Sequence, residues 1–243
     1  MAYTEYRPHP ALAPYIDAYW KVTGDDRPMT TQTILPDGCV DIIMNLGDDE
    51  LPDADGFSMK NERSYLVGAM SHAIETVVSP GSLLIGVRFR PAGFAAFYQY
   101  ESMHVFTDQT AEFDPALAPD LRRRKTDPKS YLDQFFLRKL QTGDLRIMSV
   151  IREIEAKNGL IDVSTLAQNG CMSIRQLQRT FKQHVGLSPK EFLNIMRFRH
   201  ALQLIKKGKM QSLLDIALEA GYYDHAHLSN EIRKYAGIAP SLI

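Results

Sequence analysis

The sequence predicts an α+β protein in which a mainly antiparallel β-sheet domain precedes an all-helical domain. Before about residue 110, short β-branched segments alternate with turns that contain proline, glycine and aspartate. From residue 145 onward, apolar residues recur at helical spacing. The charge is divided in the same way, because residues 1–143 carry a net charge of −6 and residues 144–243 carry +5. A basic half joined to an acidic half indicates that one half binds a polyanion.

The first domain, residues 1–110, is expected to form an antiparallel sheet, sandwich or barrel. Turn sequences separate its segments, with Pro36-Asp37-Gly38 after the first expected strand and Pro80-Gly81 before the last. A short helix is expected over residues 94–100. The expected strands cover residues 31–35, 39–46, 65–70, 75–78 and 82–89.

The middle region, residues 111–143, combines prolines with mixed charge, which indicates a linker. Within it, Leu132, Phe136 and Leu140 are four residues apart and therefore share one stripe of a helix over 131–140. Such a stripe either pairs two subunits or covers the sheet, and the sequence leaves both roles open.

Residues 163–185, at the start of the helical domain that covers 144–243, have the pattern of a helix-turn-helix unit. A short helix containing Leu166 and Ala167 is expected to end at a tight turn, Gly170-Cys171. Ser173 is then a favourable N-cap for a second helix over 174–184. The small Ala167 side chain allows the two helices to cross closely.

The second helix of this unit has one apolar and one polar face. Ile174, Leu177 and Phe181 fall at i, i+3 and i+7 and are expected to face the core. The opposite face holds three basic and no acidic side chains, which suits a polyanion. Arg binds guanine and Gln binds adenine in the major groove, so this face matches base readout. The outward residues are Arg175, Gln176, Arg179, Lys182 and Gln183, with Gln178 on the flank.

Residues 212–237 repeat the arrangement with a longer turn at Gly221-Tyr222-Tyr223. Ser212 and Asp224 are expected to cap its two helices. In the second of these helices, Leu228, Ile232 and Tyr235 are expected to face inward, and Ala226, Asn230 and Arg233 outward.

A long helix is expected between the two units. Ser188, Pro189 and Glu191 occupy the N-cap, N1 and N3 positions, which make a strong helix start. The helix runs to about Lys207 and spans roughly 27 Å at about 1.5 Å per residue. Adjacent turns of the major groove lie about 34 Å apart, so this helix could place two recognition helices in adjacent turns of a slightly bent duplex.

Together these features resemble the AraC/XylS family of transcription regulators over residues 145–243. In the N-terminal half, Leu35-Pro36-Asp37-Gly38, Asp41 and the string 86–93 (GVRFRPAG) resemble the sensor half of some members, which implies a small cupin-like β-barrel that binds an effector, oligomerises or does both. In the C-terminal half the matching strings are Leu166-Ala167, Ser173, Leu177-Gln178-Arg179, Phe181-Lys182, Gly186, Ser188-Pro189, Phe192, Arg197-Phe198, Ala201, Ile216-Ala217, Gly221-Tyr222, Asp224, Gly237 and Ala239-Pro240-Ser241.

The resemblance implies double-stranded DNA as the partner, with RNA polymerase as a further partner of an activator. Members place two recognition helices in adjacent major-groove segments. The family usually has Phe at Leu228 and Ile232, and Arg or Lys at Asn230, so the first unit is expected to carry more of the specificity. Arg197 is assigned a structural role. The residues expected to meet DNA are Ser173, Arg175, Gln176, Gln178, Arg179, Lys182, His225, Ala226, Asn230 and Arg233.

Other chemistry finds little support in the sequence. The histidines of the first half are isolated, and His225 and His227, two apart on a helix, point to different faces, so no metal site is expected. No glycine-rich phosphate loop and no Gly-x-Ser-x-Gly motif occurs, so neither an enzyme nor a cofactor is expected. No signal peptide is evident, and no apolar run reaches the ~18–20 residues of a membrane helix, so the cytoplasm is the expected location.

Arg88 and Arg90 are the candidate effector-binding residues. They alternate along one expected strand and project to the same face, where they either bind an anionic effector or pair with the acids of this domain. An alternative function also remains, in which the first domain is an enzyme or a small-molecule-binding barrel and the helical domain is a regulatory or protein-interaction appendage. A basic outward face over 174–184 favours the DNA-binding regulator.

Overall fold

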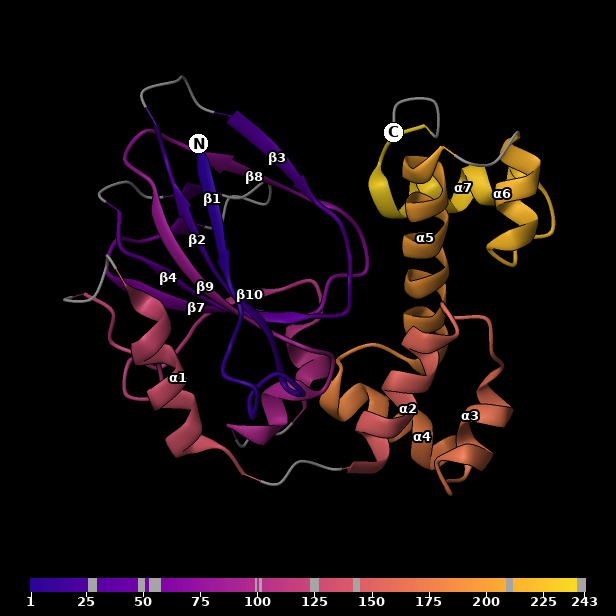
Figure 1. The fold of residues 1–243 in the computed structure, drawn as a ribbon, viewed down its shortest axis with the longest axis horizontal. Helices are drawn as coiled ribbons and strands as arrows, with labels where there is room; N and C mark the ends of the chain where they lie inside the picture. The colour runs from indigo at the N-terminus through magenta and orange to yellow at the C-terminus, as the bar shows by residue number, and fades with distance from the viewer. Residues whose placement is uncertain are drawn as a thin grey trace.

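The structure, a computed structural model, describes residues 1–25, 30–47, 51–52, 58–98, 100, 102–122, 127–141, 145–208 and 212–239. Figure 1 shows a β-rich domain beside an all-helical domain, in which the long helix α5 (Pro189–Lys207) joins two groups of shorter helices. The predicted fold class is confirmed, with an antiparallel β domain followed by two helix-turn-helix units and a long helix between them.

A six-stranded antiparallel sheet forms the centre of the β domain. Two smaller sheets accompany it: β3 (Thr30–Ile34) pairs with β8 (Ile74–Val78), and β5 (Leu51–Pro52) pairs with β6 (Ser58–Met59). The large sheet runs β1 (Ala2–Tyr6), β2 (Ile16–Thr23), β9 (Leu83–Phe89), β4 (Val40–Asn45), β7 (Arg63–Val67) and β10 (Thr110–Glu112).

The large sheet is open, which is one of the alternatives that the strand pattern allowed, and it is not the barrel that the family resemblance implied. The strands β1 and β10 are the two edges of the large sheet and are not bonded to each other. All five expected strands overlap observed ones, whereas β1, β2, β5, β6 and β10 were not predicted. The helix expected over 94–100 is a shorter 3₁₀ helix, η1 (Gly93–Ala96).

The large sheet has two differently covered faces, because successive side chains of a strand point to opposite sides. On one face, Tyr19, Val87 and Phe89 join a core in which each is 0% exposed. The helix α1 (Pro128–Lys139) covers this face with Leu132 and Phe136, so the apolar stripe of the middle region covers the sheet, one of the two roles considered for it. The small β3–β8 sheet lies over the other face, where the core is smaller.

The helical domain begins with α2 (Leu145–Ala156), which ends at Asn158 and Gly159, both with positive φ, as the C-cap pattern requires. The first helix-turn-helix unit consists of α3 (Val163–Asn169) and α4 (Ile174–His184), and the second consists of α6 (Leu213–Glu219) and α7 (His225–Ala236). The core of this domain also takes in Ala69 and Ala92 from the β domain, so the two domains pack against each other.

Candidate nucleic-acid interface

The start of α4 is fixed by a reciprocal cap. The Ser173 hydroxyl accepts a hydrogen bond from the Gln176 amide at 3.2 Å, and the Gln176 side chain accepts one from the Ser173 amide at 2.8 Å. This capping box satisfies two amides that the helix itself leaves unpaired. Ser173 and Gln176, both predicted to meet DNA, therefore also define where the recognition helix begins.

The polar face of α4 is exposed as the sequence predicted, whereas its apolar face is shorter. Leu177 and Phe181 are 0% exposed and lie in the core. Ile174 is 47% exposed, which corrects the prediction that it faces inward. It is the first residue of the helix and lies one turn before the part of α4 that packs on the core. Its side chain therefore adds an apolar element to the outward face.

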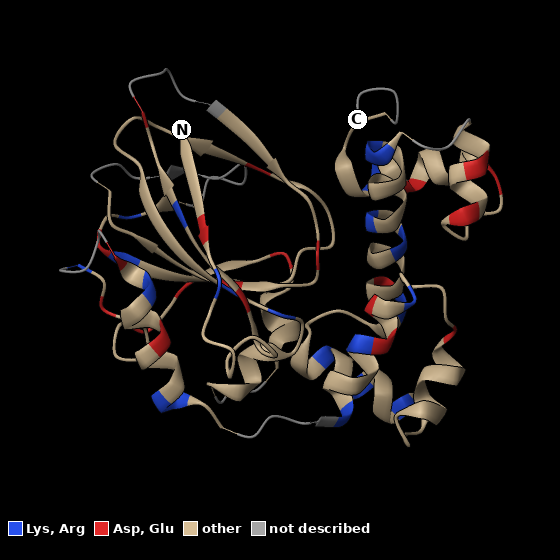
Figure 2. Ribbon diagram, in the orientation of Figure 1, with Lys and Arg blue, Asp and Glu red and all other residues tan. Residues whose placement is uncertain are grey.

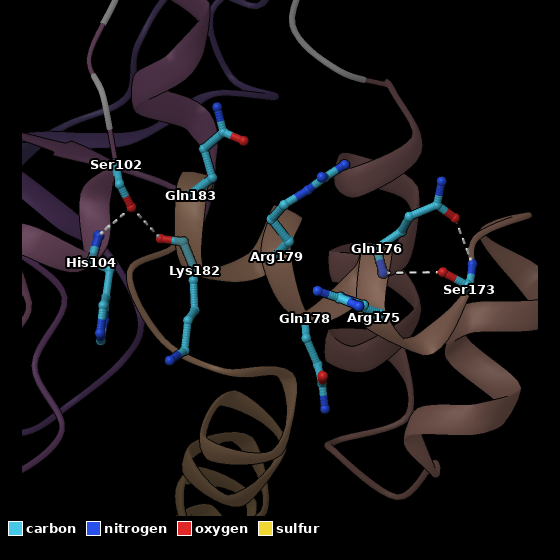
Figure 3. A pocket seen from close by; sticks show the side chains of 9 residues that line it. All are labelled: Ser102, His104, Ser173, Arg175, Gln176, Gln178, Arg179, Lys182 and Gln183. Atoms are coloured by element: carbon cyan, nitrogen blue, oxygen red, sulfur yellow. Dashed lines mark hydrogen bonds between the residues drawn. The ribbon is translucent and has the colours of Figure 1, made fainter.

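The outward side chains of α4 line an open groove of about 760 Å³. Figure 3 shows Arg175, Gln178, Arg179 and Lys182 extending from the helix surface beside this groove. Among the residues that the structure describes, no acidic side chain lines it. The structure thus brings all six residues predicted from the first unit to one surface.

The other side of this groove comes from the β domain, which sequence reasoning did not anticipate. Ser102 and His104, at the start of η2 (Met103–Phe106), line it opposite α4. The Ser102 hydroxyl donates to the Lys182 carbonyl at 3.3 Å. The Gly186 carbonyl accepts hydrogen bonds from His104 Nδ1 at 2.8 Å and from the Thr107 hydroxyl at 2.9 Å. These bonds hold the C-terminal end of α4 against the β domain.

The residues predicted from the second unit are also exposed, but two of them are hydrogen-bonded to each other. Asp224 caps α7 by accepting a hydrogen bond from the His227 amide at 2.7 Å. His225, Ala226, Asn230 and Arg233 are all exposed on this helix. Arg233 Nη1 donates to Asn230 Oδ1 at 3.3 Å, so the two side chains contact each other.

Arg197 has the structural role that was expected of it. From α5 it contacts Asn194, donates to the Gly221 carbonyl at 3.5 Å, and places its guanidinium 5.7 Å from the centroid of the Tyr222 ring. It thereby connects the long helix to the turn of the second unit.

The two units differ in charge. The segment 162–185 holds three basic residues and one acid, whereas 212–239 holds two basic residues and four acids. Figure 2 shows the contrast, with blue along α4 and α5 and red on α6. Because duplex DNA is a dense polyanion, the first unit has the stronger electrostatic attraction to it.

The turn between α3 and α4 contains a strained residue. Cys171 has φ of 51°, in the left-handed region, and Gly221 has φ of 76° in the turn of the second unit. A non-glycine residue in this region costs about 1–2 kcal/mol of stability. Glycine avoids this strain, but part of the gain is offset because glycine has more conformational freedom in the unfolded chain.

We expect Cys171→Gly to raise the free energy of unfolding by about 0.5–1 kcal/mol in urea titrations. Cys171→Ala, the matched control, should give no gain, and an equal gain would assign the effect to removal of the thiol.

Arg88 and Arg90 are both paired with acids. Arg88 Nε lies 3.4 Å from Asp41 Oδ2, and Arg88 Nη1 lies 3.9 Å from Asp37 Oδ2. Arg90 Nη2 lies 2.7 Å from Asp17 Oδ1. Both arginines therefore pair with acids of their own domain, which is the second of the two roles considered for them.

Within the described ranges, no three His, Cys, Asp or Glu side chains are grouped so that they could hold a metal ion. None of the helices in those ranges combines the length and apolarity needed to cross a membrane.

The two domains match different families of known proteins. Residues 4–112 match a family model described as a domain of unknown function (DUF6597), and residues 166–242 match one described as a helix-turn-helix domain. An uncharacterized HTH-type transcriptional regulator from Haemophilus influenzae is 39% identical over 79 residues, which are 32% of this chain and 26% of that protein. The HTH-type transcriptional activator RhaS from an Enterobacter species is 36% identical over 102 residues, 42% of this chain and 36% of that protein. The chain therefore covers well under half the length of each relative.

Solved structures to which this chain is similar include apo ToxT from Vibrio cholerae, which is 14% identical with a TM-score of 0.49, over 92% of this chain and 96% of that one. An AraC-type transcriptional regulator from Chromobacterium violaceum is 26% identical with a TM-score of 0.38, over 40% of this chain and 88% of that one. The helix-turn-helix family match and the named regulators among the relatives agree with the resemblance found in the sequence. Over residues 166–242, the chain is therefore similar to the helix-turn-helix domains of transcription regulators.

Proposed function

We propose that this protein is a sequence-specific regulator of transcription that binds double-stranded DNA and responds to a small molecule held by its N-terminal domain. The observation that carries the proposal is the exposed face of α4, which presents Arg175, Gln178, Arg179 and Lys182 with no acid among them. Arg and Gln are the side chains that read guanine and adenine edges in the major groove, and Lys182 is suited to a phosphate.

The second recognition helix, α7, is expected to contribute less to DNA binding than α4. It offers Arg233 and Lys234 against four acids of its own unit, and Asn230 is already engaged by Arg233. We therefore assign most of the base readout to α4 and a mainly positioning contact with the DNA backbone to α7.

The proposal extends to location and partners. The curated relatives named above are bacterial regulators, and bacterial DNA lies in the cytoplasm, so we place this protein there. RNA polymerase is a further partner if the protein activates transcription. A second copy of the chain is a further partner if the DNA site consists of two half-sites. We propose no catalytic activity, metal or cofactor.

Selection from a pool of random duplexes tests the proposal. The purified chain, without added ligand, is mixed with the pool at two salt concentrations, and the retained DNA is sequenced. We expect an enriched motif of about two helical turns. The logarithm of the binding constant should fall with the logarithm of salt concentration with a slope steeper than about −2, because each phosphate contact contributes about −0.9. Retention without sequence enrichment would contradict the proposal and favour the alternative of a ligand-binding or enzymatic first domain.

A further inference from the structure

A cavity of about 200 Å³ lies between the six-stranded sheet and the small β3–β8 sheet. Four apolar side chains form its inner wall and are each 6% to 8% exposed: Trp20, Val22, Val78 and Leu84. On the opposite face of the same sheet, the core residues Tyr19, Ile42 and Ile85 are 0% exposed. The core on the cavity side is therefore incompletely filled, and a guest molecule could bury the remaining apolar surface.

Gly86 makes room for the indole ring that lines this cavity. A Cβ atom at Gly86 would lie 1.9 Å from Trp20 Cε2, so the ring lies directly against the backbone of β9. Only glycine permits this approach, which keeps the indole in the wall rather than in the middle of the cavity.

The polar end of the cavity contains two carboxylates and one guanidinium. Trp20 Nε1 donates to Asp41 Oδ1 at 2.7 Å, and Arg88 Nε donates to Asp41 Oδ2 at 3.4 Å. Asp37 Oδ2 lies 3.9 Å from Arg88 Nη1. Burial raises the pKa of Asp41, and Arg88 and Trp20 oppose that rise. An anionic ligand would have to displace these acids from Arg88, and any ionised group would lose its hydration on entry.

The mouth of the cavity combines apolar side chains with the exposed Gln32 on β3. Tyr3 on β1 is 49% exposed and Ile34 on β3 is 38% exposed, and both line the opening. Thr76 lies on the wall that β8 provides, and its hydroxyl has no hydrogen-bond partner among the described residues. Cavities lined by apolar side chains with a few converging polar groups are typical sites for small molecules.

We propose that this cavity binds a compact, uncharged, largely apolar molecule of about one ring, with a hydroxyl group directed at Asp41 and Asp37. The size follows from the volume, because a dry apolar cavity of about 150 Å³ holds benzene. The polarity follows from the carboxylates, which accept hydrogen bonds and leave no unpaired cation. The inference rests on the proposed function, in which the N-terminal domain holds the effector.

Trp20 provides the test, because it is the only tryptophan of the chain. The full chain is titrated with cyclohexanol, cyclohexanecarboxylate and cyclohexylammonium, none of which absorbs where tryptophan is excited. We expect a saturable change in Trp20 emission with cyclohexanol and at least tenfold weaker binding of both charged probes. Equal or tighter binding of either charged probe would overturn the proposal, as would the absence of saturable binding by cyclohexanol.

Two matched variants on β8 show whether the probe occupies this cavity. Thr76→Phe fills the cavity and should abolish the response to cyclohexanol, whereas Glu75→Phe, at an exposed position of the same strand, should leave it unchanged. Thermal unfolding of both variants establishes that they are folded. An unchanged response in folded Thr76→Phe would place the probe elsewhere and refute the proposal. The titration contains no DNA and the duplex selection contains no ligand, so the two proposals fail independently.

Discussion

Arg179→Ala should lower the affinity for the selected duplex by about 5- to 150-fold, the equivalent of about 1–3 kcal/mol, and relax the preference at one base pair. Arg179 lies in the middle of the exposed face of α4, at the groove that Figure 3 shows, and no hydrogen bond or ion pair engages its guanidinium among the described residues. The side chain is therefore available for a bidentate contact with guanine. Fluorescence anisotropy with the selected duplex and its single-base variants measures both effects.

Two controls separate base reading from general charge loss. Lys182→Ala should weaken binding to all duplexes about equally and lower the salt slope by about one, because a phosphate contact carries no sequence information. Arg233→Ala on α7 should have the smaller effect, because the second unit is acidic. If Arg233→Ala cost more than Arg179→Ala, the assignment of specificity to the first unit would be wrong.

Gly86→Ala should destabilise the β domain by about 3 kcal/mol or more. The new methyl group would lie inside the Trp20 ring, so the indole must move and its hydrogen bond to Asp41 must break. Overpacking a core costs about 1–3 kcal/mol, and a lost hydrogen bond to a charged group costs about 1.5–3 kcal/mol. Urea unfolding measures the loss of stability, and a red shift of Trp20 emission should report the displaced ring.

Gly208→Ala is the matched control. Gly208 ends α5 with φ of 59°, and a Cβ atom there would meet nothing within 4 Å. Its cost should be limited to the backbone strain of about 1–2 kcal/mol, with unchanged Trp20 emission. A Gly86→Ala protein as stable as Gly208→Ala would mean that the sheet accommodates the methyl group without moving the indole.

The helical domain could be predicted closely because its signals are local. The Ser188–Glu191 capping box sets the start of α5, Asn158 and Gly159 end α2, and the spacing of Leu177 and Phe181 sets the buried side of α4. Each signal acts within about one helical turn, so the sequence alone displays it. Ile174 was assigned wrongly because helical spacing does not show where along a helix the packing begins.

The β domain was predicted less completely because strand pairing joins distant residues. Residues 16–23 of β2 form a central strand with buried residues on both faces, so the sequence lacks the alternation that marks a half-buried strand. The sheet would close into a barrel only if its edge strands β1 and β10 paired with each other. Neither segment carries a local sequence signal that shows whether they pair.

The same limit applies to the sites. Ser102 and His104 reach α4 across some 80 positions of sequence. In the sequence, Asp41 stands out only as one of the residues that resemble the sensor half, yet its partners Trp20 and Arg88 lie on two other strands of the sheet. Contacts of this kind require the tertiary structure.

The turn at Pro36–Gly38 contributes to both domains. Asp37 lines the cavity of the β domain, and Arg199 Nη1 on α5 lies 3.5 Å from the Asp37 carbonyl. Phe192 of α5 packs against Gly38, where a Cβ atom would lie 2.4 Å from its ring. A ligand that shifts this turn changes the free energy of the contact with the helix that carries both DNA-binding units. Thermodynamic reciprocity then requires that bound DNA change the affinity for that ligand by the same factor.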